Sequence, residues 1–159
     1  GTDATRYLLL RHAHPTEDSD ITWEKLNEWY TANLANGLGN LVSRIMRMSA
    51  DNLSGSIGSP ETGVGTNVAE HLGNFEFQKA TDLIWAEISK LDLYIQEEKP
   101  FQLVKTDPET AQEQIRFLVT KLAGIASSLA PLMPDTSAKI LELIEKNQMP
   151  EKSLFPRLN

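Results

Sequence analysis

The sequence has 159 residues, no cysteine and a formal net charge of −7 at pH 7. A chain of this length buries enough apolar surface to fold as about one domain without disulfides or a structural metal. The negative charge argues against a protein that holds nucleic acid by bulk positive charge, the lack of cysteine suits a reducing cytoplasm, and no apolar run approaches the roughly 18 residues of a membrane helix.

The first element expected is a short helix that Thr2 or Asp3 caps. Basic groups gather here, at Arg6, Arg11 and His12, and they leave a local nucleic-acid contact open despite the overall charge. The spacing of His12 and His14 resembles that of metal ligands, but we interpret the two as a solvated pair, and we expect no metal site. Residues 15–20 are polar and acidic and are expected to form a connection.

A long amphipathic helix is predicted from about Trp23 to Met48, with Thr22 as its N-cap. Spacings of three and four residues give it an apolar stripe and, beside that, a polar stripe of Asn33, Asn36, Asn40, Arg44 and Arg47. Gly37 and Gly39 each cost a helix interior about 1 kcal/mol relative to alanine. We expect them to allow close packing where this helix crosses a neighbour.

The rest of the chain predicts further helices and no strand. The glycine-rich residues 49–67 indicate a surface connection. Helices are then expected over 75–98, from Asp107–Pro108 to near Pro131, and after Pro134, followed by an extended tail over 153–158. The sum is an all-α fold, an antiparallel bundle of four to five helices.

No catalytic set of side chains occurs in a recognisable motif, so the chain alone is expected to be non-catalytic. Asn40 and Arg44 lie one helical turn apart, where an amide and a guanidinium can together bind a splayed-out nucleotide. An aromatic ring would complete such a site by stacking, and Phe101 is the candidate. The alternative is a polar helix face that bonds to a neighbouring helix.

Five segments, taken in order, resemble the methionyl-tRNA synthetase family of class I synthetases. They are 3–11 (DATRYLLLR), 33–44 (NLANGLGNLVSR), 94–101 (YIQEEKPF), 129–134 (LAPLMP) and 154–157 (LFPR). The second segment is shared with neighbouring class I synthetases, whereas the last is more typical of the methionine enzyme.

The resemblance implies a class I anticodon-binding bundle over residues 21–159, preceded by the end of a stem-contact region over 1–20. The family's His-Ile-Gly-His and Lys-Met-Ser-Lys-Ser signatures do not occur in this sequence. The implied activity, ATP-dependent ligation of methionine to its tRNA, would then belong to a longer enzyme, and this part would bind no cofactor itself. The implied partners are the CAU anticodon of methionine tRNA and the catalytic domain of the same polypeptide, without a membrane.

The resemblance also implies the site residues. Asn40 and Arg44 match positions that hydrogen-bond the anticodon bases, and Pro100 with Phe101 matches a proline-tryptophan pair on which the first anticodon base stacks. Phe101 departs from the pattern because it lacks the indole donor. Asp92 stands where the family commonly has asparagine, so its carboxylate is expected to face the site and to compete for Arg44.

Two alternative functions remain at this stage. One is the anticodon-binding domain of a leucyl-, valyl- or isoleucyl-tRNA synthetase, because the second of the five segments is shared among these enzymes. The other is a helical protein-interaction module whose polar stripe meets another protein. Exchanging the anticodon of a bound tRNA distinguishes all of these functions.

Overall fold

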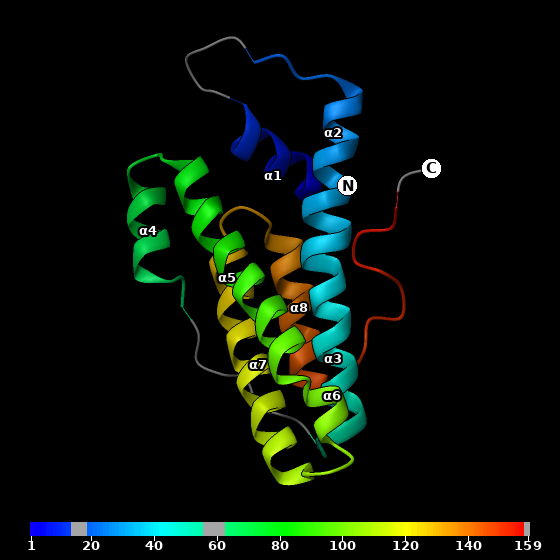
Figure 1. Cartoon of the computed structure of the whole chain (residues 1–159). Helices are drawn as coiled ribbons and strands as arrows, with labels where there is room; N and C mark the ends of the chain where they lie inside the picture. Colours follow the sequence, from blue (N-terminus) through cyan, green and yellow to red (C-terminus); the bar gives the residue numbers. More distant parts are fainter. Residues whose placement is uncertain (14–18, 56–62, 158–159) are drawn as a thin grey trace.

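Helices form nearly all of the regular structure in the computed structural model, which describes residues 1–13, 19–55 and 63–157. No strand occurs within these ranges. In chain order the described residues contain α1 (Thr2–His12), α2 (Trp23–Trp29), η1 (Tyr30–Gly39), α3 (Asn40–Asn52), α4 (Thr66–Gly73), α5 (Phe77–Glu98), α6 (Pro100–Leu103), α7 (Pro108–Leu129) and α8 (Pro134–Lys146). The predicted all-α fold is confirmed (Figure 1).

The connections between the helices set their directions in the bundle (Figure 1). Gly37 lies next to Trp85, and Arg44 pairs with Asp92, so the long helix and α5 run parallel. The long connection between α3 and α5, which includes α4, makes this parallel arrangement possible. α7 then returns antiparallel to α5, and α8 runs antiparallel to α7 (Figure 1).

The predicted long helix exists as three consecutive segments, α2, η1 and α3. Thr22 caps it as expected, because its Oγ1 accepts a hydrogen bond from the Lys25 N–H at 3.3 Å. The expected apolar stripe is buried: Leu34, Leu38 and Ile45 are fully inaccessible to solvent. The ten residues of η1 form a π-helix, which the sequence pattern did not predict. Such wider turns often occur at functional sites.

Both glycines of η1 lie where a side chain would crowd the protein. A Cβ atom at Gly39 would be 3.0 Å from the Leu34 carbonyl oxygen and 3.4 Å from Cδ2 of Phe155. One at Gly37 would be 3.3 Å from the Ala32 carbonyl oxygen and 3.9 Å from Nε1 of Trp85. The expected close packing is therefore present, although at Gly39 the neighbour is the C-terminal segment and not a helix.

Replacing Gly39 by alanine is expected to destabilise the protein by about 1–3 kcal/mol, because the backbone and Phe155 must shift to admit the methyl group. Gly124, in the interior of α7, is a matched control, since a Cβ atom there meets no atom within 4 Å. Gly124→Ala should stabilise by up to about 1 kcal/mol. Urea unfolding measures both free energies, and a stabilising Gly39→Ala would contradict this explanation of the glycine.

The sequence suggested Asp3 as a cap of the first helix, but Asp3 does not cap it. α1 begins after Gly1 without a side-chain cap. Asp3 is instead buried, and its Oδ2 accepts a hydrogen bond from the Thr136 N–H at 2.7 Å, which caps α8. Asp3 thus joins the first helix of the chain to the last. The adjoining acidic connection over 15–20 lies mostly outside the described residues.

The region between α3 and α5 contains a helix, α4, that the sequence pattern does not predict. The predicted surface connection over 49–67 is shorter than expected, since α3 extends to Asn52 and α4 begins at Thr66; residues 56–62 lie outside the described residues. α5 ends as predicted, at a left-handed Lys99 with φ of +49°, and Pro100 then occupies the first position of α6.

The last two helices follow the prediction closely, whereas the tail, which was expected to be extended, bends at residues 154–155. Asp107 caps α7, its Oδ1 accepting a hydrogen bond from the Thr110 N–H at 3.2 Å, and its contacts with Thr110 hold the pKa of this carboxyl below its usual value. The C-terminal segment, residues 148–157, contains no helix and runs beside the long helix (Figure 1). It is anchored there by the buried Phe155 ring and by Tyr30, whose hydroxyl donates to the Pro156 carbonyl at 2.8 Å.

Candidate functional site

The polar stripe of the long helix forms one wall of a cavity of about 340 Å³ on the surface of the bundle. Asn40, Ser43, Arg44 and Arg47 line this wall. They share it because residues three and four apart lie on one face of a helix, opposite the buried stripe that holds α3 in the core. We call this space the α3 cavity. It brings together the two residues, Asn40 and Arg44, that the sequence predicts for binding.

Arg44 forms an ion pair with Asp92 of α5, through Nη1 of the arginine and Oδ1 of the aspartate. The Gln96 amide donates to the other carboxylate oxygen at 2.8 Å. The expected competition of Asp92 for Arg44 is thus present. The two side chains of the ion pair are 33% and 39% exposed, so solvent screens the pair and its contribution to stability is small, at most about 1 kcal/mol. A guanidinium has further N–H groups to offer to a ligand.

The structure does not bring Phe101 into the α3 cavity. Pro100 is buried at the start of α6, and Phe101 follows it with 46% of its surface exposed. Neither is among the residues that line the cavity in the described part of the chain. Lys99 ends α5 two turns beyond Asp92, roughly 10 Å along the helix axis. An exposed ring in that position can stack on a ligand that extends beyond the cavity.

A second cavity, of about 330 Å³, adjoins the first along the same helix. It shares Asn40 and Ser43 with the α3 cavity and is closed on its far side by residues of the C-terminal segment. Arg157 contributes from that segment, its Nη2 donating to Oδ1 of Asn36 at 3.3 Å. No sequence signal assigns a role to Arg157 or to Met149, because their distance from α3 along the chain hides their proximity to it in space.

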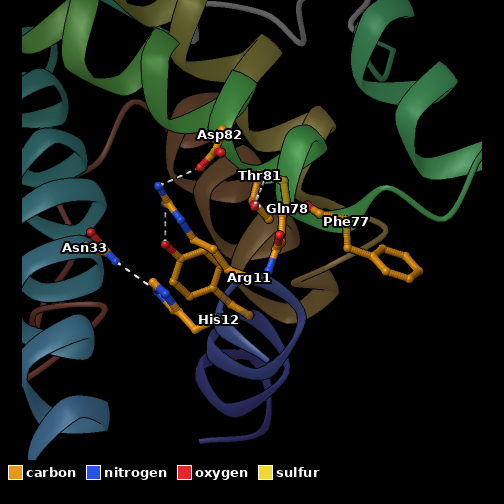
Figure 2. Close-up of polar contacts among 8 residues, drawn as sticks. Arg11, His12, Asn33, Phe77, Gln78, Thr81 and Asp82 are labelled. Carbon is orange, nitrogen blue, oxygen red and sulfur yellow. Dashed lines mark hydrogen bonds and ion pairs between the residues drawn. The ribbon is translucent and has the colours of Figure 1, made fainter. Parts of the chain in front are cut away.

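Two of the early basic residues, Arg11 and His12, are engaged inside the protein (Figure 2), whereas Arg6 is exposed. The Arg11 guanidinium donates to the Tyr7 hydroxyl at 2.6 Å, pairs with Asp82 at 3.0 Å and lies 5.1 Å from the Trp85 ring centroid. Its side chain is only 18% exposed. Arg11 therefore holds α1 against α5. The sequence left a nucleic-acid contact open for Arg11, and the structure does not support that contact.

His12 is not the solvated residue that its spacing from His14 suggested. Its ring stacks on Trp29, with centroids 4.0 Å apart and planes 7° from parallel. Its Nε2 lies 3.5 Å from the Asn33 amide (Figure 2). Burial, and then the positive charge of Arg11, lower the pKa of His12. His14 lies outside the described residues. A neutral, stacked imidazole helps to hold α1 against the long helix.

A larger groove, of about 630 Å³, lies elsewhere, between α1, α2 and the C-terminal segment. Its lining is mostly apolar and includes Trp23, which is 82% exposed. Within the described residues, no group of three or more histidine, aspartate or glutamate side chains could hold a metal ion. Among the helices described, none has the length and hydrophobicity to cross a bilayer.

Comparison with known families identifies two matching regions. A model described as the anticodon binding domain of methionyl tRNA ligase matches residues 62–154, which is more than half of the chain. A second model, described as tRNA synthetases class I (M), matches residues 1–46. The α3 cavity draws on both regions, because Asn40 and Arg44 lie in the second match, whereas Met149 and Pro150 lie in the first.

Similar proteins include methionine–tRNA ligases of known sequence. That of Fusobacterium nucleatum is 34% identical over 155 residues, which are 88% of this chain and 24% of the relative. That of Roseobacter denitrificans is 34% identical over 157 residues, covering 89% of this chain and 27% of the relative. The chain thus spans about a quarter of the length of these curated relatives.

Solved structures agree with these sequence matches. A methionyl-tRNA synthetase of Mycobacterium tuberculosis in its free state superposes with a TM-score of 0.82 at 24% identity, over all of this chain and 39% of that one. The same enzyme bound by methionyl-adenylate gives a TM-score of 0.79 at 25% identity, over 98% of this chain and 38% of that one. The first of these, at its low identity, shows a shared fold.

Proposed function

The chain belongs to the methionyl-tRNA ligase family and carries the family's anticodon-binding domain, and we propose that it recognises the CAU anticodon of methionine tRNA on the polar face of α3. The observation that carries the proposal is the grouping of Asn40, Arg44 and Arg47 around one cavity in this domain. The family match favours the methionine enzyme over the leucyl, valyl and isoleucyl alternatives, whose domains share the motif around Asn40.

The chemistry of the α3 cavity suits the unpaired bases of an anticodon loop. An asparagine amide both donates and accepts hydrogen bonds, so Asn40 can pair with the edge of a base. The guanidinium of Arg44 donates in a planar fork that fits a base edge or a phosphate. RNA-binding proteins read single-stranded loops in this way, because bases that are not paired expose their hydrogen-bonding edges.

The net charge of −7 is consistent with this function if recognition depends on local groups. Asp92 lowers the local positive charge, because its carboxylate pairs with Nη1 of Arg44. An RNA that displaces this carboxylate must supply a better partner for the guanidinium. We propose that Asp92 thereby weakens the binding of every RNA that does not offer the Arg44 guanidinium a better partner.

We further propose that this chain is one part of a longer cytoplasmic enzyme that joins methionine to its tRNA with ATP. In this proposal the chain binds neither ATP nor methionine, and a catalytic domain of the same polypeptide supplies both sites. The groove at Trp23 lies at the end of the bundle where Arg11 holds α1 against α5. In the sequence it is distant from Phe101 and the end of α5.

Phe101 is proposed as a stacking platform, and Phe101→Ala is expected to weaken binding of methionine tRNA by about 1–3 kcal/mol, the usual loss for one stacked base. The stability of the protein should change little, because the ring is 46% exposed. Phe75, which is 79% exposed and precedes α5, provides a matched control in Phe75→Ala. A filter-binding assay with equal affinities for Phe101→Ala and the unchanged protein would contradict the platform.

Anticodon exchange tests the proposed function as a whole. Transcripts of methionine tRNA are titrated with the chain, one with CAU and others with valine or isoleucine anticodons in the same body. The proposal expects tighter binding of the CAU transcript. Equal binding of all transcripts would overturn recognition of the anticodon. Binding of none would favour the alternative of a protein-interaction module whose polar stripe meets another protein.

A further inference from the structure

The α3 cavity has a second wall that the proposed function does not use. Met149 and Pro150 of the C-terminal segment lie opposite Asn40, Arg44 and Arg47. Met149 is 38% exposed, although it is a large apolar side chain. One wall of the cleft is therefore apolar and the other carries amide and guanidinium groups. A flat ring can pack against the first wall, and polar groups of the same ligand can bond to the second.

The apolar wall is held in place by bonds at its base. Asn147 ends α8 in the left-handed conformation, with φ of +48°, and turns the chain toward α3. Its side-chain amide donates to the Leu53 carbonyl at 2.9 Å and accepts from the Ser49 hydroxyl at 2.6 Å. Ser49 lies in the last turn of α3, and Leu53 directly follows that helix. The two walls are therefore fixed relative to each other before any ligand binds.

Arg47 is the charged group of this cavity that is available to a ligand. Arg44 is engaged by Asp92, whereas among the described residues no hydrogen bond or ion pair joins the exposed Arg47 guanidinium to another side chain. A planar guanidinium binds phosphate oxygens through two parallel N–H groups. The volume of about 340 Å³ is at the lower end of the range for small-ligand pockets, which suits one nucleotide.

We infer that the α3 cavity binds a single nucleotide of single-stranded RNA, whose phosphate is bound by Arg47 and whose base or ribose packs against Met149 and Pro150. The inference rests on the proposed function and extends it, because these three residues add a phosphate contact and a packing surface to the reading pair Asn40 and Arg44. Arg47 contributes affinity that does not depend on sequence, whereas Asn40 and Arg44 supply the selectivity. Phe101, outside the cavity, serves a neighbouring base.

The first test compares Arg47→Gln with Arg116→Gln, which removes the same charge from an exposed position on α7. The probes are anticodon stem-loop RNAs that carry CAU or an altered anticodon, titrated at several salt concentrations. Arg47→Gln is expected to weaken binding of both RNAs about tenfold and to lower the slope of log affinity against log salt by about 0.7. Arg116→Gln should leave both quantities unchanged.

The second test uses Met149→Ala. It is expected to weaken binding of both RNAs about three- to tenfold without changing the salt slope, because no charge is removed. The inference is overturned if Arg47→Gln retains full affinity and the full salt slope, or if Met149→Ala binds as the unchanged protein does.

The outcomes separate the two proposals. If the unchanged protein binds CAU and altered RNAs equally but Arg47→Gln and Met149→Ala show their expected losses, the nucleotide site stands and anticodon selectivity fails. If the unchanged protein prefers CAU but Arg47→Gln and Met149→Ala bind normally, selectivity stands and the nucleotide site is overturned. If the unchanged protein binds neither RNA, both proposals are overturned.

Discussion

Arg44→Met is expected to weaken binding of a CAU anticodon stem-loop by about 2 kcal/mol, roughly thirtyfold. Methionine preserves much of the apolar stem of arginine but removes the donors that face the α3 cavity. The substitution also leaves the Asp92 carboxylate without its ion-pair partner at the edge of the site, where it repels the RNA backbone. Isothermal titration calorimetry or filter binding measures the loss.

Two controls show that this loss comes from recognition. Arg116→Met, on the exposed face of α7, removes the same charge away from the cavity and should bind normally. Adding Asp92→Asn to Arg44→Met should restore part of the affinity, because it removes the unpaired carboxylate. The free energy of unfolding should change by no more than the contribution of a screened ion pair, about 1 kcal/mol or less. An Arg44→Met protein that binds CAU RNA with full affinity would contradict the role of Arg44.

Phe155→Ala is expected to destabilise the protein by about 3 kcal/mol. The ring is 6% exposed, meets Tyr30 edge to face with centroids 6.2 Å apart, and lies against Gly39. Removing it leaves a hole between the C-terminal segment and the long helix. Phe117→Ala is the control, because Phe117 is 41% exposed on α7 and its removal should cost less than about 1 kcal/mol.

The consequence of Phe155→Ala extends to the α3 cavity. Phe155 helps to anchor the segment that carries Met149, so its loss should also weaken RNA binding under conditions where the protein remains folded. Guanidinium unfolding gives the stability, and binding is then measured well below the transition. A stability equal to that of Phe117→Ala would show that the C-terminal segment contributes little to the packing of the bundle.

Much of the fold could be predicted from the sequence, because local signals set most helix boundaries. Thr22 and Asp107 each bond to an N–H three residues later, within the reach of a sequence pattern. Asp3 caps a helix 133 residues away, a partner that no local pattern reveals. The π-helical segment η1 was also missed, because spacings of three and four residues bury the same leucines in either kind of helix.

The candidate site could be predicted only in part, because local spacing reveals which residues share a helix face but not which distant segments meet. Asn40 and Arg44 share a helix face by their spacing alone, and the structure confirms that they line one cavity. Met149 reaches that cavity through the turn at Asn147, which tertiary contacts with Ser49 and Leu53 hold in place. Phe101 remains a prediction from resemblance, since the cavity does not include it.

Photochemical crosslinking tests the central claim, recognition of the anticodon on the polar face of α3, most directly. A methionine tRNA with 4-thiouridine as the uridine of CAU is irradiated with the protein, and the attached peptide is identified by mass spectrometry. Attachment is expected within residues 40–47, 92–101 or 149–150. It should be lost when unlabelled CAU RNA competes and retained when RNA with an altered anticodon is added. Attachment to α1, α2 or the groove at Trp23 would contradict it.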